Sequence, residues 1–309
     1  MMEMEKGIVP TNLVRHRSEL PARPFQRIVS LVPSLSEALV VLGLGDRLVG
    51  VTAYCVEPPG AFEGLARIGG TKDADVEAIL ALAPDLVIAN QEENTARVVG
   101  RLAERGVAVW VTYPRSVRAG AELLCELAEF GASPEARARV VDPVLAALEA
   151  AESARTAAER AGRRRPRVFC AIWRDPWMTV GADTYIHDLI ELCGGENAFA
   201  NGARGTGGPD DAGGGAGGES ARRDGNRSGS ERRYPIVGLS DIERAAPEVI
   251  LLPSEPYAFG EVDRGEFAGL DCPAAVHDRI HLIDGTLVSW YGPRIAEAIR
   301  VLGRLLAIS

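Results

Sequence analysis

Short apolar runs alternate with amphipathic stretches along most of the chain. The run Ile28–Val32 is rich in β-branched residues, which is typical of a buried strand in a parallel sheet. Pro33 ends this run, and Ser34 with Glu37 three residues later forms the pattern of a capping box. The apolar residues that follow have helical spacing, and Gly43 ends them. The pattern predicts a strand, a tight turn and a capped helix, which is the first half of a βαβ unit.

A second region repeats this plan. Arg167–Ile172 predicts another buried strand, and Thr184–Phe199 aligns without gaps on Ser34–Val49, its first residue taking the N-cap position. Farther along each half, Ile79–Glu92 aligns without gaps on Ile242–Glu255. Two matches in the same order favour two α/β lobes of similar construction, each with a parallel sheet.

The region between the two halves predicts one long helix. Ser133 is a good N-cap, Pro134 fits the first helical turn, and good helix formers dominate up to Gly162. A helix of this length would join the lobes rigidly. The predicted organisation is a polar N-terminal extension (1–26), an N-terminal lobe (27–132), a linking helix (133–165) and a C-terminal lobe (166–309).

A segment rich in Gly, Ser, Arg and Asp interrupts the C-terminal lobe at residues 202–233. It holds too few apolar residues to order itself, so we expect a disordered insert. Its arginines suggest nucleic-acid binding as an alternative function of the insert. The acidic residues interleaved with them argue against it. The formal net charge of the whole chain, −9, also disfavours nucleic acid and anionic membrane surfaces as partners.

The sequence also bears on the compartment. No apolar stretch approaches the roughly 20 residues of a membrane span. Residues 1–26 lack the apolar core of a signal peptide, and the five scattered cysteines favour reduced thiols. As written, the sequence predicts a cytoplasmic monomer; a start site farther upstream would make the protein extracytoplasmic.

Candidate binding residues follow the predicted strands. Ligands of open parallel sheets bind outside the carboxyl ends of the strands, and large aromatic side chains gather in these segments. They favour a flat, partly apolar ligand, the alternative being that each ring covers the core of its own lobe. Among the polar neighbours, Cys55 is either an axial metal ligand or a small buried hydrophobe. The candidate ligand-binding residues are Tyr54, Cys55, Glu92, Asn94, Trp173, Trp177, Tyr257, Trp290, Tyr291 and Arg294.

Patterns for catalysis and metal binding are weak. His187 and Glu191 have the i, i+4 spacing of a metal pair, but His187 aligns with Glu37 on a predicted core helix, which favours a structural role. The chain has no Walker loop, no G-x-S-x-G and no H-E-x-x-H. We therefore expect no catalytic residues, no metal site and no intrinsic cofactor.

Three segments together carry a family resemblance: RIVSLVPSLSEALVVLGLGDRLVGVTAYCVEPP, IGGTKDADVEAILALAPDLVIAN and IELCGGENAF. They resemble the substrate-binding proteins of vitamin B12, iron-siderophore and haem ABC importers, a superfamily of helical-backbone metal receptors, and the cobalamin-binding branch most of all. The resemblance covers residues 27–200 and 234–307. It implies two α/β lobes joined by one long helix, with the ligand held in a cleft by aromatic side chains. By position, Tyr54 matches a cleft tyrosine, and Glu77 matches a carboxylate that docks onto the permease.

These observations lead to one hypothesis and two alternatives. The main hypothesis is a non-enzymatic binding protein for cobalamin or a related metal chelate, with an ABC permease as a partner that the resemblance implies. The first alternative is an iron-siderophore or haem binder that uses Arg115, Arg174 and Arg294 against ligand carboxylates. The second is a tetrapyrrole metal chelatase that uses His187 and Glu191.

Overall fold

The computed structural model describes residues 13–21, 23–202 and 233–307. The chain divides into two compact units. Unit 1 comprises Met1–Pro114, Arg118–Ala146 and Tyr291–Pro293, and unit 2 comprises Arg115–Val117, Ala147–Trp290 and Arg294–Ser309. The disorder predicted for the Gly-rich insert concerns residues that lie almost entirely outside the described ones.

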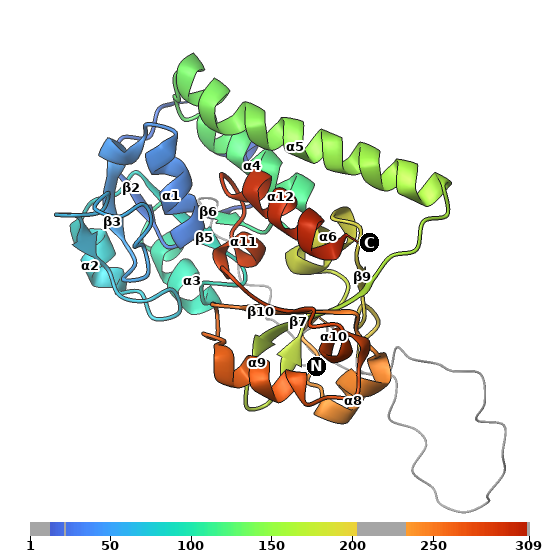
Figure 1. The fold of residues 1–309 in the computed structure, drawn as a ribbon. Coiled ribbons are helices and arrows are strands. Elements are labelled where there is room, and N and C mark those ends of the chain that lie inside the picture. The colour runs from blue at the N-terminus through green and yellow to red at the C-terminus, as the bar shows by residue number, and fades with distance from the viewer. Residues whose placement is uncertain (1–12, 22, 203–232, 308–309) are drawn as a thin grey trace, which may run out of the picture. The chain divides into compact units, whose positions relative to one another are not determined.

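Unit 1 contains a parallel sheet, as the apolar runs predict (Figure 1). In spatial order its strands are β1 (Leu13–Val14), β6 (Val109–Thr112), β5 (Leu86–Asn90), β2 (Ile28–Ser30), β3 (Leu48–Val51) and β4 (Ala66–Arg67). The edge strand β1 pairs with β6 although it lies within the predicted N-terminal extension. Phe25, also in that extension, is fully buried and packs edge-on against Phe130. The first unit therefore begins before residue 27, because these apolar residues complete its sheet and core.

The helices of unit 1 cover this sheet. They are α1 (Pro33–Val41), α2 (Val76–Ala81), α3 (Ala96–Glu104) and α4 (Val117–Ala128), with short 3-10 turns at Arg17–Glu19 and Gly45–Arg47. Ile79 of α2 and Leu102 of α3 pack into one apolar cluster with strand residues such as Val29 and Val87. The capping box predicted at Ser34 is wrong. Helix α1 begins at Pro33, whose fixed φ suits a first helical position, so Ser34 lies inside the helix.

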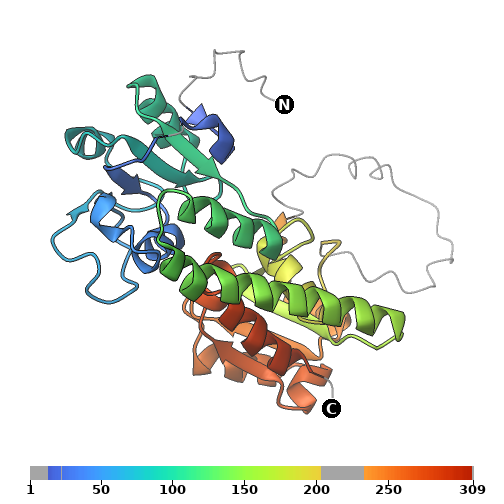
Figure 2. The ribbon, with the colours of Figure 1, turned by 90° about the horizontal axis from the view of Figure 1, so that it is seen from above.

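Helix α5 (Pro134–Arg160) is the long helix that the sequence predicts, and it runs unbroken in both views (Figure 1, Figure 2). The Ser133 hydroxyl accepts a hydrogen bond from the backbone N–H of Ala136 (3.1 Å), as an N-cap does. The helix continues through Pro143. Its residues up to Ala146 belong to unit 1 and the rest to unit 2.

Unit 2 contains a second, mainly parallel sheet. Its parallel strands are β9 (Glu196–Asn197), β7 (Arg167–Trp173), β10 (Val249–Pro253) and β11 (Ile280–Ile283), and β8 (Met178–Thr179) pairs with β7 in the antiparallel direction. Helices α6 (Tyr185–Leu192) and α12 (Ile295–Leu306) lie on one side of the sheet (Figure 1). On the other side lie α8 (Leu239–Ala245), α9 (Glu261–Ala268) and α10 (Pro273–Val276), and α11 (Thr286–Ser289) precedes α12. The N-cap predicted at Thr184 is confirmed, since its side chain accepts from the N–H of His187.

Candidate ligand-binding site

The clearest candidate in unit 2 is an aromatic pair, one ring of which is exposed and the other half-buried. Trp173 ends strand β7 and is 43% exposed. Its ring meets Tyr257, which follows the neighbouring strand β10, edge to face (centroids 5.8 Å apart, 72° between planes). Both residues come from carboxyl ends of parallel strands, where ligands of such sheets bind. We call Trp173 and Tyr257 the aromatic face.

Trp177 lies in the same turn as Trp173 but packs into unit 2. Its ring stacks on Phe259 (6.0 Å, 11°) and meets Phe267 at 4.8 Å, and it packs against the apolar core of unit 2. Tyr257 also contacts Phe259 (4.7 Å). Trp177 thus covers the core of its own lobe, which is the alternative that the sequence left open. Phe259 and Phe267 were absent from the predicted set, although Phe259 lies in the same strand-end segment as Tyr257.

Arg174 is held in place by carboxylates. Its guanidinium pairs with Asp263, which is 5% exposed, and with Glu266 (2.8 Å) on α9. It also lies over the Trp177 ring, 5.2 Å from the centroid. The hydrogen bond to Asp263 and the nearby acids raise the pKa of the Arg174 guanidinium above its ordinary value. The second Asp263 oxygen accepts from the Gly260 N–H at the start of α9, so this network joins the Trp173 turn to that helix.

Trp290 and Arg294 are packing residues in unit 2. Trp290 is 8% exposed, and the Arg294 guanidinium lies over its ring at 5.0 Å. Arg294 also donates to the Thr286 hydroxyl (2.8 Å) and pairs with Asp284 (3.7 Å). The structure therefore places Trp290 away from solvent, where it presents little surface to a ligand.

Tyr291 belongs to unit 1 and is 6% exposed. Its hydroxyl accepts from the Asn90 side-chain amide (2.6 Å) and donates to the Glu93 carboxylate (3.1 Å). The side-chain oxygen of Asn90, Oδ1, accepts in turn from the backbone N–H groups of Glu92 and Glu93. This buried network fixes the turn after β5, and the sequence signal for it is the polar Asn90 that closes an otherwise apolar strand.

Two of the predicted ligand contacts, Cys55 and Asn94, are buried and hydrogen-bonded within unit 1. Cys55 has no exposed surface, and its thiol donates to the Ser36 hydroxyl (3.2 Å) and contacts the Thr52 hydroxyl (3.3 Å). Asn94 is 6% exposed; its amide donates to backbone carbonyls and its oxygen accepts from the Asn90 N–H (2.7 Å). Both side chains satisfy buried polar groups of loops, a role that residue type alone does not reveal.

Tyr54 and Glu92 are the accessible candidates of unit 1. Tyr54 is 63% exposed, and Glu92 is half-buried. The turn below Tyr54 is fixed by the Arg67 guanidinium, which donates to the carbonyls of Thr52 (3.0 Å) and Cys55 (2.8 Å). Tyr54 is thus an exposed ring on a well-held turn.

Glu77, the predicted docking carboxylate, is exposed at the start of α2. The same Glu77 oxygen lies 3.3 Å from Arg101 and 3.2 Å from Arg105. Any partner arginine would therefore compete with two arginines of the same unit.

The remaining polar candidates form structural contacts. Glu191 pairs with Arg165 and accepts from the backbone N–H of Asn197 (3.0 Å), while the Asn197 amide contacts the His187 ring (3.3 Å). Among the described residues, no group of three or more His, Cys, Asp or Glu side chains is arranged to hold a metal ion. In the same part of the chain, no helix has the length and apolar composition needed to cross a bilayer.

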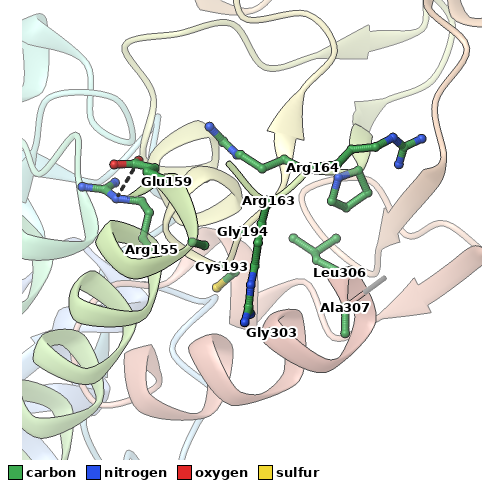
Figure 3. Close-up of a pocket in the computed structure, with 12 residues that line it drawn as sticks. Arg155, Glu159, Arg163, Arg164, Cys193, Gly194, Gly303, Leu306 and Ala307 are labelled. Atoms are coloured by element: carbon green, nitrogen blue, oxygen red, sulfur yellow. Dashed lines mark ion pairs between the residues drawn. The ribbon is translucent and has the colours of Figure 1, made fainter. Parts of the chain in front are cut away.

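A separate hollow of about 520 Å³ lies in unit 2 beside the end of α5 (Figure 3). Three of the arginines that line it pair with carboxylates: Arg155 with Glu159, Arg164 with Glu248 and Arg165 with Glu191. Burial raises the pKa of its Cys193 thiol to about 12, which keeps the thiol protonated. None of the predicted ligand-binding residues lines this hollow.

Comparison with known proteins identifies the family. A family model described as "Periplasmic binding protein" matches residues 28–255. Vitamin B12-binding proteins of Yersinia pestis and Yersinia pseudotuberculosis are 34% identical over 183 residues, which are 59% of this chain and 63% of each relative. The match thus spans less than two thirds of the length of these relatives.

Solved structures share the fold. The periplasmic vitamin B12 binding protein BtuF of Vibrio cholerae superimposes with a TM-score of 0.69 at 23% identity, over 92% of this chain and 97% of that one. The periplasmic heme-binding protein BhuT, in complex with two hemes, gives 0.67 at 23% identity, over 91% and 97%. These likenesses establish the two-sheet α/β architecture. The chain belongs to the periplasmic binding protein family.

Proposed function

We propose that this protein is a substrate-binding protein of an ABC importer, that its ligand is cobalamin or a related corrinoid, and that the aromatic face is its main contact in unit 2. The edge-to-face pair of the exposed Trp173 and the half-buried Tyr257 carries the proposal, because a flat macrocycle buries apolar area against such rings. The names of the curated relatives support the ligand class.

The compartment and partner are part of this proposal. Of the two compartments that the sequence left open, we propose the extracytoplasmic one, since the similar solved structures are described as periplasmic. We further propose that the protein works as a monomer and delivers its ligand to a permease through the Glu77 surface. The ligand is cargo, and the proposal includes no intrinsic cofactor and no catalytic step.

Titration of the purified protein with cyanocobalamin tests the ligand class, with haem and a ferric siderophore as comparison ligands. Heat and the visible spectrum should report one saturable site for cyanocobalamin. Saturable binding of haem or the siderophore alone would move the protein to the iron-chelate alternative. Metal insertion into a porphyrin that depends on His187 would favour the chelatase alternative.

A further inference from the structure

An anionic chelate needs arginines that are available to pair with its carboxylates, and the arginines near the aromatic face are already paired with acids. Arg115, Arg174 and Arg294 are the cations that the sequence offered for binding ligand carboxylates. In the structure Arg115 pairs with Asp183 (2.7 Å), and Arg294 pairs with Asp284. Arg174 is engaged by two carboxylates of α9 and lies over an indole ring. Every one of these guanidinium groups already has an acidic partner within unit 2.

Acidic side chains follow three neighbouring strands at the same edge of the sheet. Asp175 comes after β7 with a side chain 93% exposed, and Asp284 comes after β11 with 51% exposed. Glu255 comes after β10, two residues before Tyr257, and its carboxylate accepts from the Ser289 hydroxyl (2.6 Å). Because the strands are parallel, their carboxyl ends meet at one edge, so these acids flank the aromatic face.

Two of these acids are themselves paired, Asp175 with Arg174 (3.8 Å) and Asp284 with Arg294 (3.7 Å). Together with Asp263 and Glu266, however, the carboxylates at this edge outnumber the two guanidinium groups, and the excess gives the edge a negative potential. Like charges brought together at an interface disfavour binding, whereas hydrogen-bond donors of a neutral ligand find acceptors there. The family includes proteins named for vitamin B12 and proteins named for heme. Haem carries carboxylates at its periphery, and a corrinoid such as cobalamin carries mainly carboxamides. The two ligand classes therefore differ in the charge of their periphery, and a negatively charged edge interacts differently with each.

We propose that the strand-end acids Asp175, Glu255 and Asp284 act as a charge filter, which excludes carboxylate-bearing chelates and accepts a chelate whose periphery is neutral and donates hydrogen bonds. This inference rests on the proposed function, since it names the chemical class of ligand for the same aromatic face. Arg174 is a positioning residue in this account: it holds the Trp173 turn against α9 and is unavailable to a ligand anion.

A matched pair of corrinoids separates charge from shape. Dicyanocobinamide presents carboxamides, and dicyanocobyrinic acid presents carboxylates on the same macrocycle. We expect the wild-type protein to bind the amide form at least tenfold more tightly at low ionic strength. The difference should shrink at high salt, because exposed charges are screened.

Two substitutions test the filter directly. Asp175→Asn removes one exposed acid, and asparagine tolerates the left-handed backbone found there (φ 57°). Glu266→Gln frees one side of the Arg174 guanidinium. Each should narrow the affinity gap, the ratio of the two dissociation constants, at least threefold, because dicyanocobyrinic acid binds more tightly once a negative charge is removed. Glu196→Gln, which removes an exposed acid at the opposite end of the sheet, should leave the gap unchanged.

The outcomes distinguish the two proposals. Equal binding of both corrinoids, or a gap that neither Asp175→Asn nor Glu266→Gln alters, overturns the charge filter and leaves the proposed function standing. If neither corrinoid binds, the proposed function fails, and the charge filter fails with it.

Discussion

Replacing Trp173 with alanine tests the aromatic face quantitatively. A buried tryptophan removes up to roughly 200 Å² from water. Since 43% of this side chain is still exposed, about 85 Å² remains for a ligand to cover. At about 25 cal/mol per Å² this area is worth ~2 kcal/mol of binding free energy. The dissociation constant for cyanocobalamin should therefore be roughly 30-fold higher in Trp173→Ala.

The same substitution should also lower the free energy of unfolding, because the buried part of the ring, about 115 Å², is worth ~3 kcal/mol at the same coefficient. The ring loses its edge contact with Tyr257, which is worth about 0.5–1.5 kcal/mol. Calorimetric titration gives the dissociation constant, and thermal melting followed by circular dichroism gives the stability.

Val276→Ala is the matched control, because Val276 is 74% exposed but precedes the amino end of β11. It should bind like the wild type. If Trp173→Ala binds cyanocobalamin within twofold of Val276→Ala, then Trp173 is not a ligand contact and the reasoning from exposed aromatic area is wrong.

Three further predictions concern the framework of the site. Tyr291→Phe removes the hydroxyl that joins Asn90 and Glu93, and should lower the free energy of unfolding by about 1–3 kcal/mol, whereas Tyr54→Phe on the surface should change it by less than about 0.5 kcal/mol. Denaturant titrations check both, and equal stabilities would contradict the buried network. Gly285→Ala places a Cβ 2.4 Å from the Glu255 backbone N and should lower the free energy of unfolding by about 1–3 kcal/mol. Gly303→Ala in α12 meets open space and should not destabilise the protein. Equal melting temperatures for these two variants would refute the close approach of Gly285 to Glu255. Burial, with help from Arg279, lowers the pKa of His281, so the stability that neutral His281 contributes is complete above pH 6.5 and is lost as the pH falls through the lowered value. His281→Gln should therefore flatten the acid side of the stability curve between pH 7 and 5, and an unchanged curve would show that another group causes the loss.

Local patterns predicted the fold well where hydrophobic burial decides the structure. The apolar runs became β2, β5, β7 and β10 because each is buried on both faces of its sheet. Thr184 and Ser133 cap their helices as expected. Ser34 does not, since a proline just before it could begin the helix one residue earlier.

The binding residues were harder to predict, because exposure depends on packing between distant segments. Trp173 and Trp177 lie four residues apart in one turn, yet one is exposed and the other covers the core. Cys55 and Asn94 resemble ligand contacts by type and position, but nearby buried hydroxyls and carbonyls use their polar atoms. The pairing of Arg174 with Asp263 joins residues 89 positions apart, a distance that no local pattern spans.

A crystal structure of the complex with cyanocobalamin would test the central claim most directly. We predict density for the corrin ring in van der Waals contact with the Trp173 indole, with carboxamides directed toward the strand-end acids. Density for the ligand elsewhere, for example in the arginine-lined hollow beside α5, with Trp173 still exposed, would contradict it.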